Sequence, residues 1–147
     1  MLVDANMLIY AVDEERAEHE PVRGWLEGAL NGSVRVGLPW ESLTAFVRIT
    51  TNPRAMRNPL TPNEAWEYIA TWTEADVVWH PSPTDRHADV LGSLIRELSL
   101  AGNLIPDAHL AAIAIEHGVA VVSADSDFAL FADRVPWINP AGIGRQN

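Results

Sequence analysis

A short, uninterrupted apolar run, Val119 to Val122, lies between a helical pattern that stops at Gly118 and a polar stretch that begins at Ser123. A strand that is apolar on both sides is typical of a sheet buried on both faces. Similar short strands are expected over residues 1–4, 34–38, 77–79 and 135–138. Helical patterns separate these runs, and strands that alternate with helices predict an α/β fold with a parallel sheet and right-handed crossovers.

The helices expected between the strands begin and end at recognisable signals. Thr61-Pro62 is a cap followed by proline in the first turn, and Gly118 is a typical residue just beyond a helix end. The expected helices run from residue 6 onward, over 15–30, after Pro39, over 62–72, over 83–102 and from Pro106 to 118, with a short one within 125–131. The segment 52–62 is the clearest loop, and we expect 139–147 to be a mobile tail.

The composition excludes several classes of protein. The 147 residues predict a single domain, 1–147, and 48% hydrophobic residues are enough for a packed core. The net charge is −10, all ten basic residues are Arg, and neither Lys nor Cys occurs, which excludes thiolate metal sites and chemistry that needs a lysine. The start lacks the basic region of a signal peptide, and no apolar run approaches the roughly 20 residues of a membrane helix. We therefore expect a soluble, cytoplasmic protein.

Acidic residues follow the strands and open the helices. Asp4 ends the first strand, Asp125 and Asp127 follow the strand 119–122, Glu41 follows the second strand, and Asp107 lies in the first turn of a helix. Because the carboxyl ends of parallel strands form one edge of the sheet, these acids are expected to converge there. Close carboxylates repel one another unless a cation is present, and Mg²⁺ or Mn²⁺ prefers such oxygens. The spacing favours a metal site, without excluding structural roles for each acid.

Each of these residues has a structural alternative. Glu41 and Asp107 could only complement the helix dipole, and Asp125 and Asp127 could only form a turn. Asn6 could cap the helix that follows it or hold the Asp4 carboxylate.

Other polar and aromatic residues carry weaker signals. His109 lies two residues after Asp107, on another helix face, so a polar or capping role is expected rather than a shared metal. Trp40 adjoins Glu41 and could wall the site. Arg54 and Arg57 in the proline-rich loop are candidate RNA contacts, although solvated arginines are common there.

Three segments together resemble a known family: the opening LVDAN, Glu41, and NLIPDAHLAAIAIEHGVAVVSADSDFALF over 103–131. They are similar to PIN-domain ribonucleases, and most similar to VapC-type toxins of bacterial toxin–antitoxin pairs. The resemblance implies a three-layer α/β/α fold with a short parallel central sheet. Carried over by position, it implies catalytic acids Asp4, Glu41, Asp107 and Asp125, metal ligands Asp4, Asp107, Asp125 and Asp127, and a supporting Asn6.

The resemblance also implies a function. It predicts an endoribonuclease toxin that uses Mg²⁺, with Mn²⁺ as a substitute, to cut RNA with a metal-activated water. It further implies a homodimer and a VapB-type antitoxin whose C-terminal segment covers the site. With a net charge of −10, we expect this partner to place an arginine among the carboxylates and to wrap the helices within residues 6–30.

Two alternatives compete with this hypothesis. A phosphatase of the haloacid dehalogenase type also has an acid at the end of its first strand, but it needs Asp at position 6 and a lysine, and this chain has Asn6 and no lysine. A non-catalytic acidic module that binds an arginine-rich partner would carry a similar cluster. Metal-dependent cleavage of RNA, lost in Asp4→Asn, distinguishes the enzyme from the module.

Overall fold

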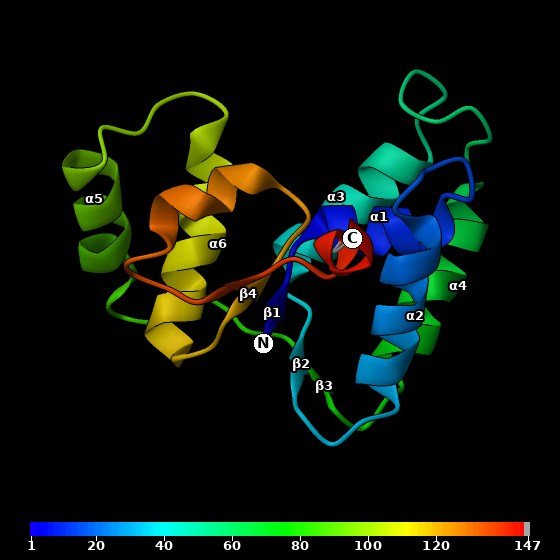
Figure 1. The fold of residues 1–147 in the computed structure, drawn as a ribbon, viewed down its shortest axis with the longest axis horizontal. Helices are drawn as coiled ribbons and strands as arrows, with labels where there is room; N and C mark the ends of the chain where they lie inside the picture. Colours follow the sequence, from blue (N-terminus) through cyan, green and yellow to red (C-terminus); the bar gives the residue numbers. More distant parts are fainter. Residues whose placement is uncertain (146–147) are drawn as a thin grey trace.

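A short parallel sheet forms the centre of the molecule (Figure 1). The computed structural model describes the backbone of residues 1–145 and the side chains of residues 1–142. The strands are β1 (Leu2–Val3), β2 (Val36–Gly37), β3 (Val78–Trp79), β4 (Val121–Val122) and β5 (Trp137–Ile138). Their order is β3-β2-β1-β4-β5, and every neighbouring pair is parallel. The predicted parallel α/β sheet is therefore confirmed.

Helices cover both faces of this sheet. They are α1 (Ala5–Val12), α2 (His19–Leu30), α3 (Trp40–Thr50), α4 (Pro62–Thr73), α5 (His87–Glu97) and α6 (Leu104–His117), with 3-10 helices η1 (Ser126–Phe131) and η2 (Pro140–Arg145). Figure 1 shows α5, α6 and η1 on one side of the strands and α1 to α4 on the other. The three-layer α/β/α arrangement is the predicted one.

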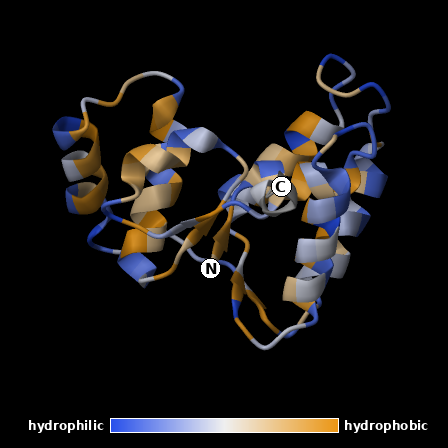
Figure 2. Ribbon diagram, viewed as in Figure 1, coloured by the Kyte–Doolittle hydropathy of each residue, from blue (hydrophilic) through white to orange (hydrophobic). Residues whose placement is uncertain are grey.

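The two core clusters explain why the strands are apolar throughout. Leu2 and Val121 pack with α6 and η1, whereas the next residues, Val3 and Val122, pack with α1 to α4. Adjacent side chains of a strand point to opposite faces, so a strand buried on both sides must be apolar at every position. The strands are accordingly hydrophobic in Figure 2. None of the helices within residues 1–145 is both long and apolar enough to cross a membrane.

Two helix ends form as the sequence predicts. The Thr61 hydroxyl accepts a hydrogen bond from the Glu64 backbone N–H at 3.1 Å, and the Glu64 carboxylate accepts one from the Thr61 N–H at 3.0 Å, which is a capping box at the start of α4. Gly118 ends α6 with φ at +65°, a left-handed conformation that favours glycine.

Three boundaries differ from the sequence prediction. Helix α2 begins at His19 rather than at residue 15, because residues 13–18 form turns in which Asp13 accepts a hydrogen bond from the Glu15 N–H. Helix α5 covers only His87–Glu97 of the expected 83–102, because Thr84 bonds to α6 instead of capping a helix. Helix α6 begins at Leu104, two residues before Pro106.

The segment 139–147, expected to be a mobile tail, begins with residues that pack against the rest of the protein, and its mobility stays a prediction. Pro140–Arg145 forms η2, Pro140 is buried, and Ala141 packs against the core cluster of α1 to α4. The helix η2 also contacts α2. The last two positions of the expected tail, 146 and 147, lie outside the described residues.

Candidate active site

Asp4 lies at the point where β1 ends and α1 begins. Its Oδ1 accepts a hydrogen bond from the Ala5 N–H at 2.7 Å, and its Oδ2 accepts one from the Ser123 hydroxyl at 2.7 Å. Burial raises the pKa of Asp4, the hydrogen bonds from Ser123 and Ala5 lower it in part, and the charge of Asp125 raises it further. The net pKa is above the usual value, so the site holds a carboxylate whose negative charge is poorly compensated.

Asn6 and Ser123 join the ends of β1 and β4. The Asn6 Nδ2 donates to the Asp4 Oδ2 at 3.1 Å and to the Ser123 Oγ at 3.0 Å, and the Asn6 Oδ1 accepts from the Ala124 N–H at 3.2 Å. Asp4 itself caps α1. Of the two roles considered for Asn6, the geometry therefore matches that of holding the Asp4 carboxylate.

Asp107, Asp125 and Asp127 meet next to this junction. One carboxylate oxygen from each lies within 4.8 Å of those of the other two. Asp107 comes from the first turn of α6, and Asp125 caps η1 by accepting the Asp127 N–H at 2.9 Å. Burial, followed by the charges of Asp4, Asp125 and Asp127, raises the pKa of Asp107 to about 7. Three oxygen donors with excess negative charge fit a hard divalent cation such as Mg²⁺ or Mn²⁺.

Glu41 does not belong to this group of three aspartates. It is in the first turn of α3, and its side chain is 39% exposed. The neighbouring Ser42 hydroxyl donates to the Val3 carbonyl at 2.7 Å, which fixes the start of α3 next to the end of β1. The Glu41 Oε1 lies 3.8 Å from the Nε2 of His109, a residue two positions after Asp107. Glu41 thus contacts α6, the helix whose first turn carries Asp107.

The structure revises the expectations for the remaining residues. His109 has a polar role, as expected, but it contacts both Glu41 and His87 rather than capping a helix. Trp40 precedes Glu41 in the sequence, and its ring stacks with those of Trp66 and His80, with ring centroids 6.4 and 5.2 Å away.

The structure does not bring Arg54 and Arg57 to the acids. They lie in the loop that follows the C-terminal end of α3, whereas Glu41 lies at its start. A helix of 11 residues separates the two, which is about 16 Å at 1.5 Å per residue. Arg57 pairs with Glu15 at 3.4 Å.

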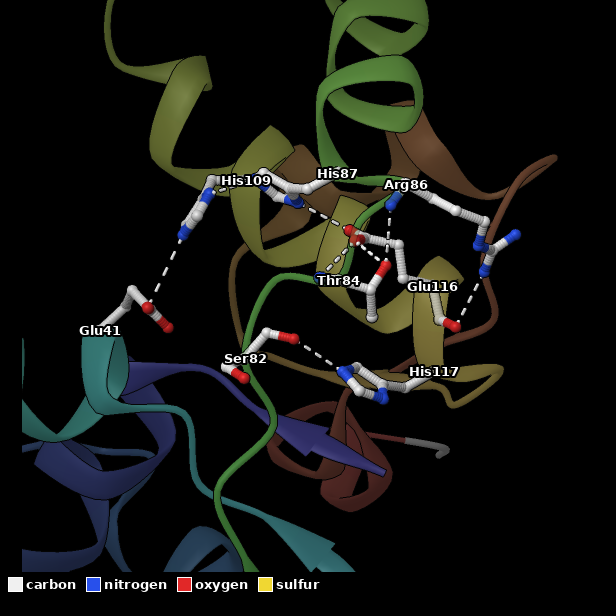
Figure 3. Close-up of polar contacts among 8 residues, drawn as sticks. All are labelled: Glu41, Ser82, Thr84, Arg86, His87, His109, Glu116 and His117. Atoms are coloured by element: carbon white, nitrogen blue, oxygen red, sulfur yellow. Dashed lines mark hydrogen bonds and ion pairs between the residues drawn. The ribbon is translucent and has the colours of Figure 1, made fainter.

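The sequence reasoning missed the part played by Ser123 and by a group on α5 and α6. Ser123 is fully buried and donates to Asp4, a role that its position in the sequence does not indicate. His87, His109 and Glu116 form a connected group (Figure 3). The seven-residue spacing of His109 and Glu116 places them on one face of α6, which is a signal in the sequence. No such signal links them to His87.

Comparisons with known proteins point to one family. Residues 1–134 match the family model of the PIN domain. Ribonuclease VapC37 of Mycobacterium tuberculosis is 42% identical over 142 residues, 97% of this chain and 98% of the relative. Ribonuclease VapC43 of the same species is 36% identical over 140 residues, 95% of both chains.

Solved structures show the same fold at low sequence identity. VapBC2 of Rickettsia felis, in a complex with a promoter DNA fragment, has a TM-score of 0.65 at 14% identity and covers 94% of this chain and 96% of that one. FitAcB of Neisseria gonorrhoeae has a TM-score of 0.62 at 18% identity, with 95% and 96% covered. The family model and the relatives above 30% identity span nearly the whole chain. The chain therefore belongs to the PIN-domain family and, within it, to the VapC-type ribonucleases.

Proposed function

We propose that the chain is a Mg²⁺-dependent endoribonuclease toxin that hydrolyses RNA phosphodiesters and is neutralised by a cognate VapB-type antitoxin. The observation that carries the proposal is the meeting of Asp107, Asp125 and Asp127 within 4.8 Å, beside Asp4. Relatives named as VapC ribonucleases support the choice of RNA as the substrate. Mn²⁺ is the expected substitute, because it also prefers carboxylate oxygens.

In this proposal the acids have two roles, metal binding and catalysis. Asp4, Asp107, Asp125 and Asp127 hold the cation, and Asp4, Glu41, Asp107 and Asp125 form the catalytic set. A bound Mg²⁺ supplies an activated water and offsets charge on the phosphoryl oxygens. Asn6 and Ser123 keep the Asp4 carboxylate aimed at the cluster through bonds of 3.1 and 2.7 Å. Glu41, whose side chain is partly exposed, is the acid that we propose to hold a proton during cleavage.

The decisive experiment is cleavage of single-stranded RNA by the purified protein with Mg²⁺, with chelator, and in the Asp4→Asn variant. We expect cleavage with Mg²⁺, none with chelator, and a loss of about 100-fold or more in Asp4→Asn. Asp76→Asn, a change at an exposed acid in the turn before β3, is the control and should cleave normally. A folded wild-type protein that binds an arginine-rich partner but cuts no RNA would favour the non-catalytic acidic module instead.

RNA contacts outside the acids are also part of the proposal. Arg54 and Arg57 remain candidates, although they lie beyond the far end of α3, so they would contact nucleotides away from the cleaved bond. Trp40 is 46% exposed and offers an unpaired base an apolar contact at the edge of its ring, next to Glu41 in sequence. Arg54→Ala should raise KM and leave kcat unchanged. An unchanged KM would remove this residue from the RNA surface.

The surface of this chain has a groove that suits such an antitoxin. A cavity of about 400 Å³ lies between α1, α2 and α4, with Leu26 and Trp72 among its apolar residues and Glu14 and Glu27 at its rim. A second hollow, with Glu64 and Glu67, continues along α2 and α4. This surface includes the helices expected from the sequence to be wrapped. An amphipathic segment with arginines would match both its apolar lining and its charge.

The partner mechanism is tested by substitution in the antitoxin. We expect its C-terminal arginines to block the site, because a guanidinium can pair with carboxylates that would otherwise hold the cation. Changing these arginines to alanine should abolish inhibition but keep binding in the groove. Full inhibition by the alanine variant would refute an arginine in the acidic site, while leaving the partner itself in place.

We also propose a homodimer. Trp40 and Trp66 stack on each other at the surface, where they are 46% and 54% exposed. Two adjacent exposed rings are unusual on the surface of a monomer. A second copy that covered Trp66 would bury this area. Light scattering should give twice the chain mass for the wild type, and a monomer at micromolar concentration would contradict the proposal.

A further inference from the structure

An arginine in the turn that follows α1 folds back over an aromatic ring of that helix. The guanidinium carbon of Arg16 lies 5.1 Å from the centre of the Tyr10 ring, and its Nε lies 3.5 Å from the Asp13 Oδ2. The Arg16 side chain is nevertheless 50% exposed, and within residues 1–142 its guanidinium donates no hydrogen bond. A cation is therefore held on a ring face while its N–H groups stay available to a ligand.

Hydrogen bonds fix the backbone of this turn beside α1. The Arg16 N–H donates to the Asp13 carbonyl at 3.1 Å, and the Arg16 carbonyl accepts from the His19 N–H at 3.1 Å. The His19 Nδ1 lies 2.9 Å from the Tyr10 carbonyl oxygen, which ties the start of α2 to the last turns of α1. A side chain on such a turn loses less conformational entropy when it binds a ligand than one on an open loop does.

Tyr10 lies on the face of α1 that is turned to the acids. It follows Asn6 by four residues, and residues at this spacing share one helix face. Asn6 contacts Asp4 and the end of β4. Helical side chains lean toward the N-terminus, so the Tyr10 ring extends toward Asn6. Burial raises the pKa of Tyr10, and the charge of Arg16 lowers it in part. The charges of Asp125 and Asp4 are among those that raise it further, as expected for a phenol near the acidic site.

The turn also touches the proline-rich loop that carries Arg54 and Arg57. Glu15, which precedes Arg16, pairs with Arg57 at 3.4 Å. Figure 1 shows both segments at the end of the molecule toward which the strands run. Tyr10, Arg16 and Arg57 thus lie one after another along a path that leads away from the acidic cluster, and both arginines on this path are exposed.

An RNA strand that binds at the acidic cluster needs a cation near it. The chain carries −10 and the proposed metal site is built from aspartates, so a phosphate beyond the reach of the metal is repelled. A guanidinium can bond two phosphate oxygens with its fork of N–H groups while its face lies on an aromatic ring. Arg16 is such a group, and its ring partner belongs to the helix that begins after Asp4.

We propose that Arg16, seated on the Tyr10 ring, binds a backbone phosphate of the RNA other than the cleaved one, and that the strand continues from there toward Arg57. Arg16 is a substrate-binding residue, and Tyr10 is a positioning residue that acts through it. The proposal rests on the proposed function, because it takes RNA as the substrate and the acidic cluster as the place of cleavage.

Two substitutions of Arg16 test the phosphate contact. Arg16→Gln removes the charge, and we expect KM for single-stranded RNA to rise about tenfold with kcat nearly unchanged. The slope of log KM against log salt should fall by about 0.7, the value for one phosphate contact on a single strand. Arg16→Lys keeps the charge but not the fork, so the slope should be kept while KM rises. An unchanged KM and slope in Arg16→Gln would overturn the proposal.

Arg96→Gln is the matched control. It makes the same change of net charge at an exposed position of α5, which Figure 1 shows across the sheet from α1, and it should leave both KM and the slope unchanged. An equal rise of KM in the two variants would show that RNA responds only to the net charge, and the assignment to Arg16 would then be wrong.

The part played by Tyr10 is tested through its ring. Tyr10→Phe keeps the aromatic face and should bind RNA like the wild type, whereas Tyr10→Leu keeps an apolar side chain without that face and should raise KM. In the Tyr10→Leu background, Arg16→Gln should raise KM less than it does alone, because the guanidinium is no longer held. Fully additive effects would remove Tyr10 from the proposal. The Arg16 variants test the phosphate contact even where Tyr10→Leu fails to fold.

A binding measurement separates this inference from the proposed function. Glu41→Gln keeps the proposed metal ligands, and the anisotropy of a labelled single-stranded RNA in Mg²⁺ gives Kd in this background without cleavage. Adding Arg16→Gln should weaken binding about tenfold. If the wild type cuts no RNA and Kd still depends on Arg16, the proposed function fails while the phosphate contact stands. If the wild type cuts RNA and Kd does not depend on Arg16, the proposed function stands and the phosphate contact is refuted.

Discussion

The raised pKa of a single aspartate gives the metal-free protein a characteristic pH dependence. Asp107 has a pKa of about 7 in the folded chain against its usual 3.8. Between these values the folded state keeps a proton that the unfolded state has lost, so the free energy of unfolding falls as the pH rises. Asp4, whose pKa is also raised, acts in the same direction.

We therefore expect the melting temperature in chelator to drop by roughly 2–4 °C from about pH 5 to about pH 8, after allowance for solvent screening of a partly exposed group. Asp107→Asn should remove most of this drop, and Asp76→Asn should not. Mg²⁺ should raise the melting temperature more at the higher pH, where it does not compete with a proton. Glu116 adds nothing to this window, because its lowered pKa acts below its usual 4.5. A flat profile in chelator would contradict the charge coupling.

Ser123 carries a second prediction at the residue scale. Its hydroxyl donates to the Asp4 Oδ2 at 2.7 Å and accepts from the Asp125 N–H at 3.0 Å, all in a fully buried position. Ser123→Ala leaves the Asp125 N–H without its acceptor and the Asp4 Oδ2 with Asn6 as its remaining donor, and it should cost about 1–3 kcal/mol of stability. Because Asp4 is then less firmly held, RNA cleavage should also fall about tenfold.

Chemical denaturation and a cleavage assay test these two effects together. Ser33→Ala, at an exposed position in the turn between α2 and β2, is the matched control and should leave both unchanged. Wild-type cleavage by a folded Ser123→Ala protein would mean that Asn6 alone is enough to hold Asp4.

At the scale of elements, the sheet depends on a close approach at one glycine. A Cβ on Gly37 would lie 2.8 Å from the Met1 carbonyl oxygen and 3.0 Å from the Pro81 Cγ. Gly37 also donates its backbone N–H to that carbonyl at 2.7 Å, so the strands cannot separate without losing the bond. Gly37→Ala should cost about 1–3 kcal/mol or more.

The matched change lies on α2, where a Cβ on Gly24 meets nothing within 4 Å. Gly24→Ala should stabilise the protein by about 0.5–1 kcal/mol, because alanine has the higher helix propensity. Urea unfolding of both variants checks the pair. Equal destabilisation would show that the contact with Met1 is not what limits this position.

The helices and strands also show which parts of the structure the sequence could predict. The strand ends could be placed because apolar runs stop at polar residues, and from them followed the positions of Asp4, Asp125 and Asp127. The contact between His87 and His109 could not, since it depends on how α5 packs against α6 across 22 residues of sequence. Local signals also misled: Thr84 resembles a helix cap, but its hydroxyl bonds to the buried Glu116.

Tertiary packing also makes contacts that the composition does not predict. The composition of the last residues indicates a tail, and in the structure Pro140 is buried and Ala141 packs against the core cluster of α1 to α4. For Glu41, the sequence predicts the position of the residue but not its contact. Its place at the start of α3 follows from the sequence, but its contact with His109 is fixed only by the packing of α6.

At the scale of the whole molecule, the charge predicts how RNA binding responds to salt. The chain carries −10 with ten arginines and no lysine. Proteins that bind nucleic acid through many basic residues release counterions and lose about 10³–10⁵ in affinity from about 50 to about 200 mM salt. An acidic chain repels RNA at long range, and added salt screens that repulsion.

We therefore expect KM for single-stranded RNA, measured at constant Mg²⁺, to change by less than about threefold over this range. In Arg54→Ala and Arg57→Ala, the slope of log KM against log salt should change by no more than the loss of one phosphate contact would cause. A steep rise of KM with salt would show instead that surface arginines carry the RNA, and it would contradict the expectation that the net charge of the molecule dominates its encounter with RNA.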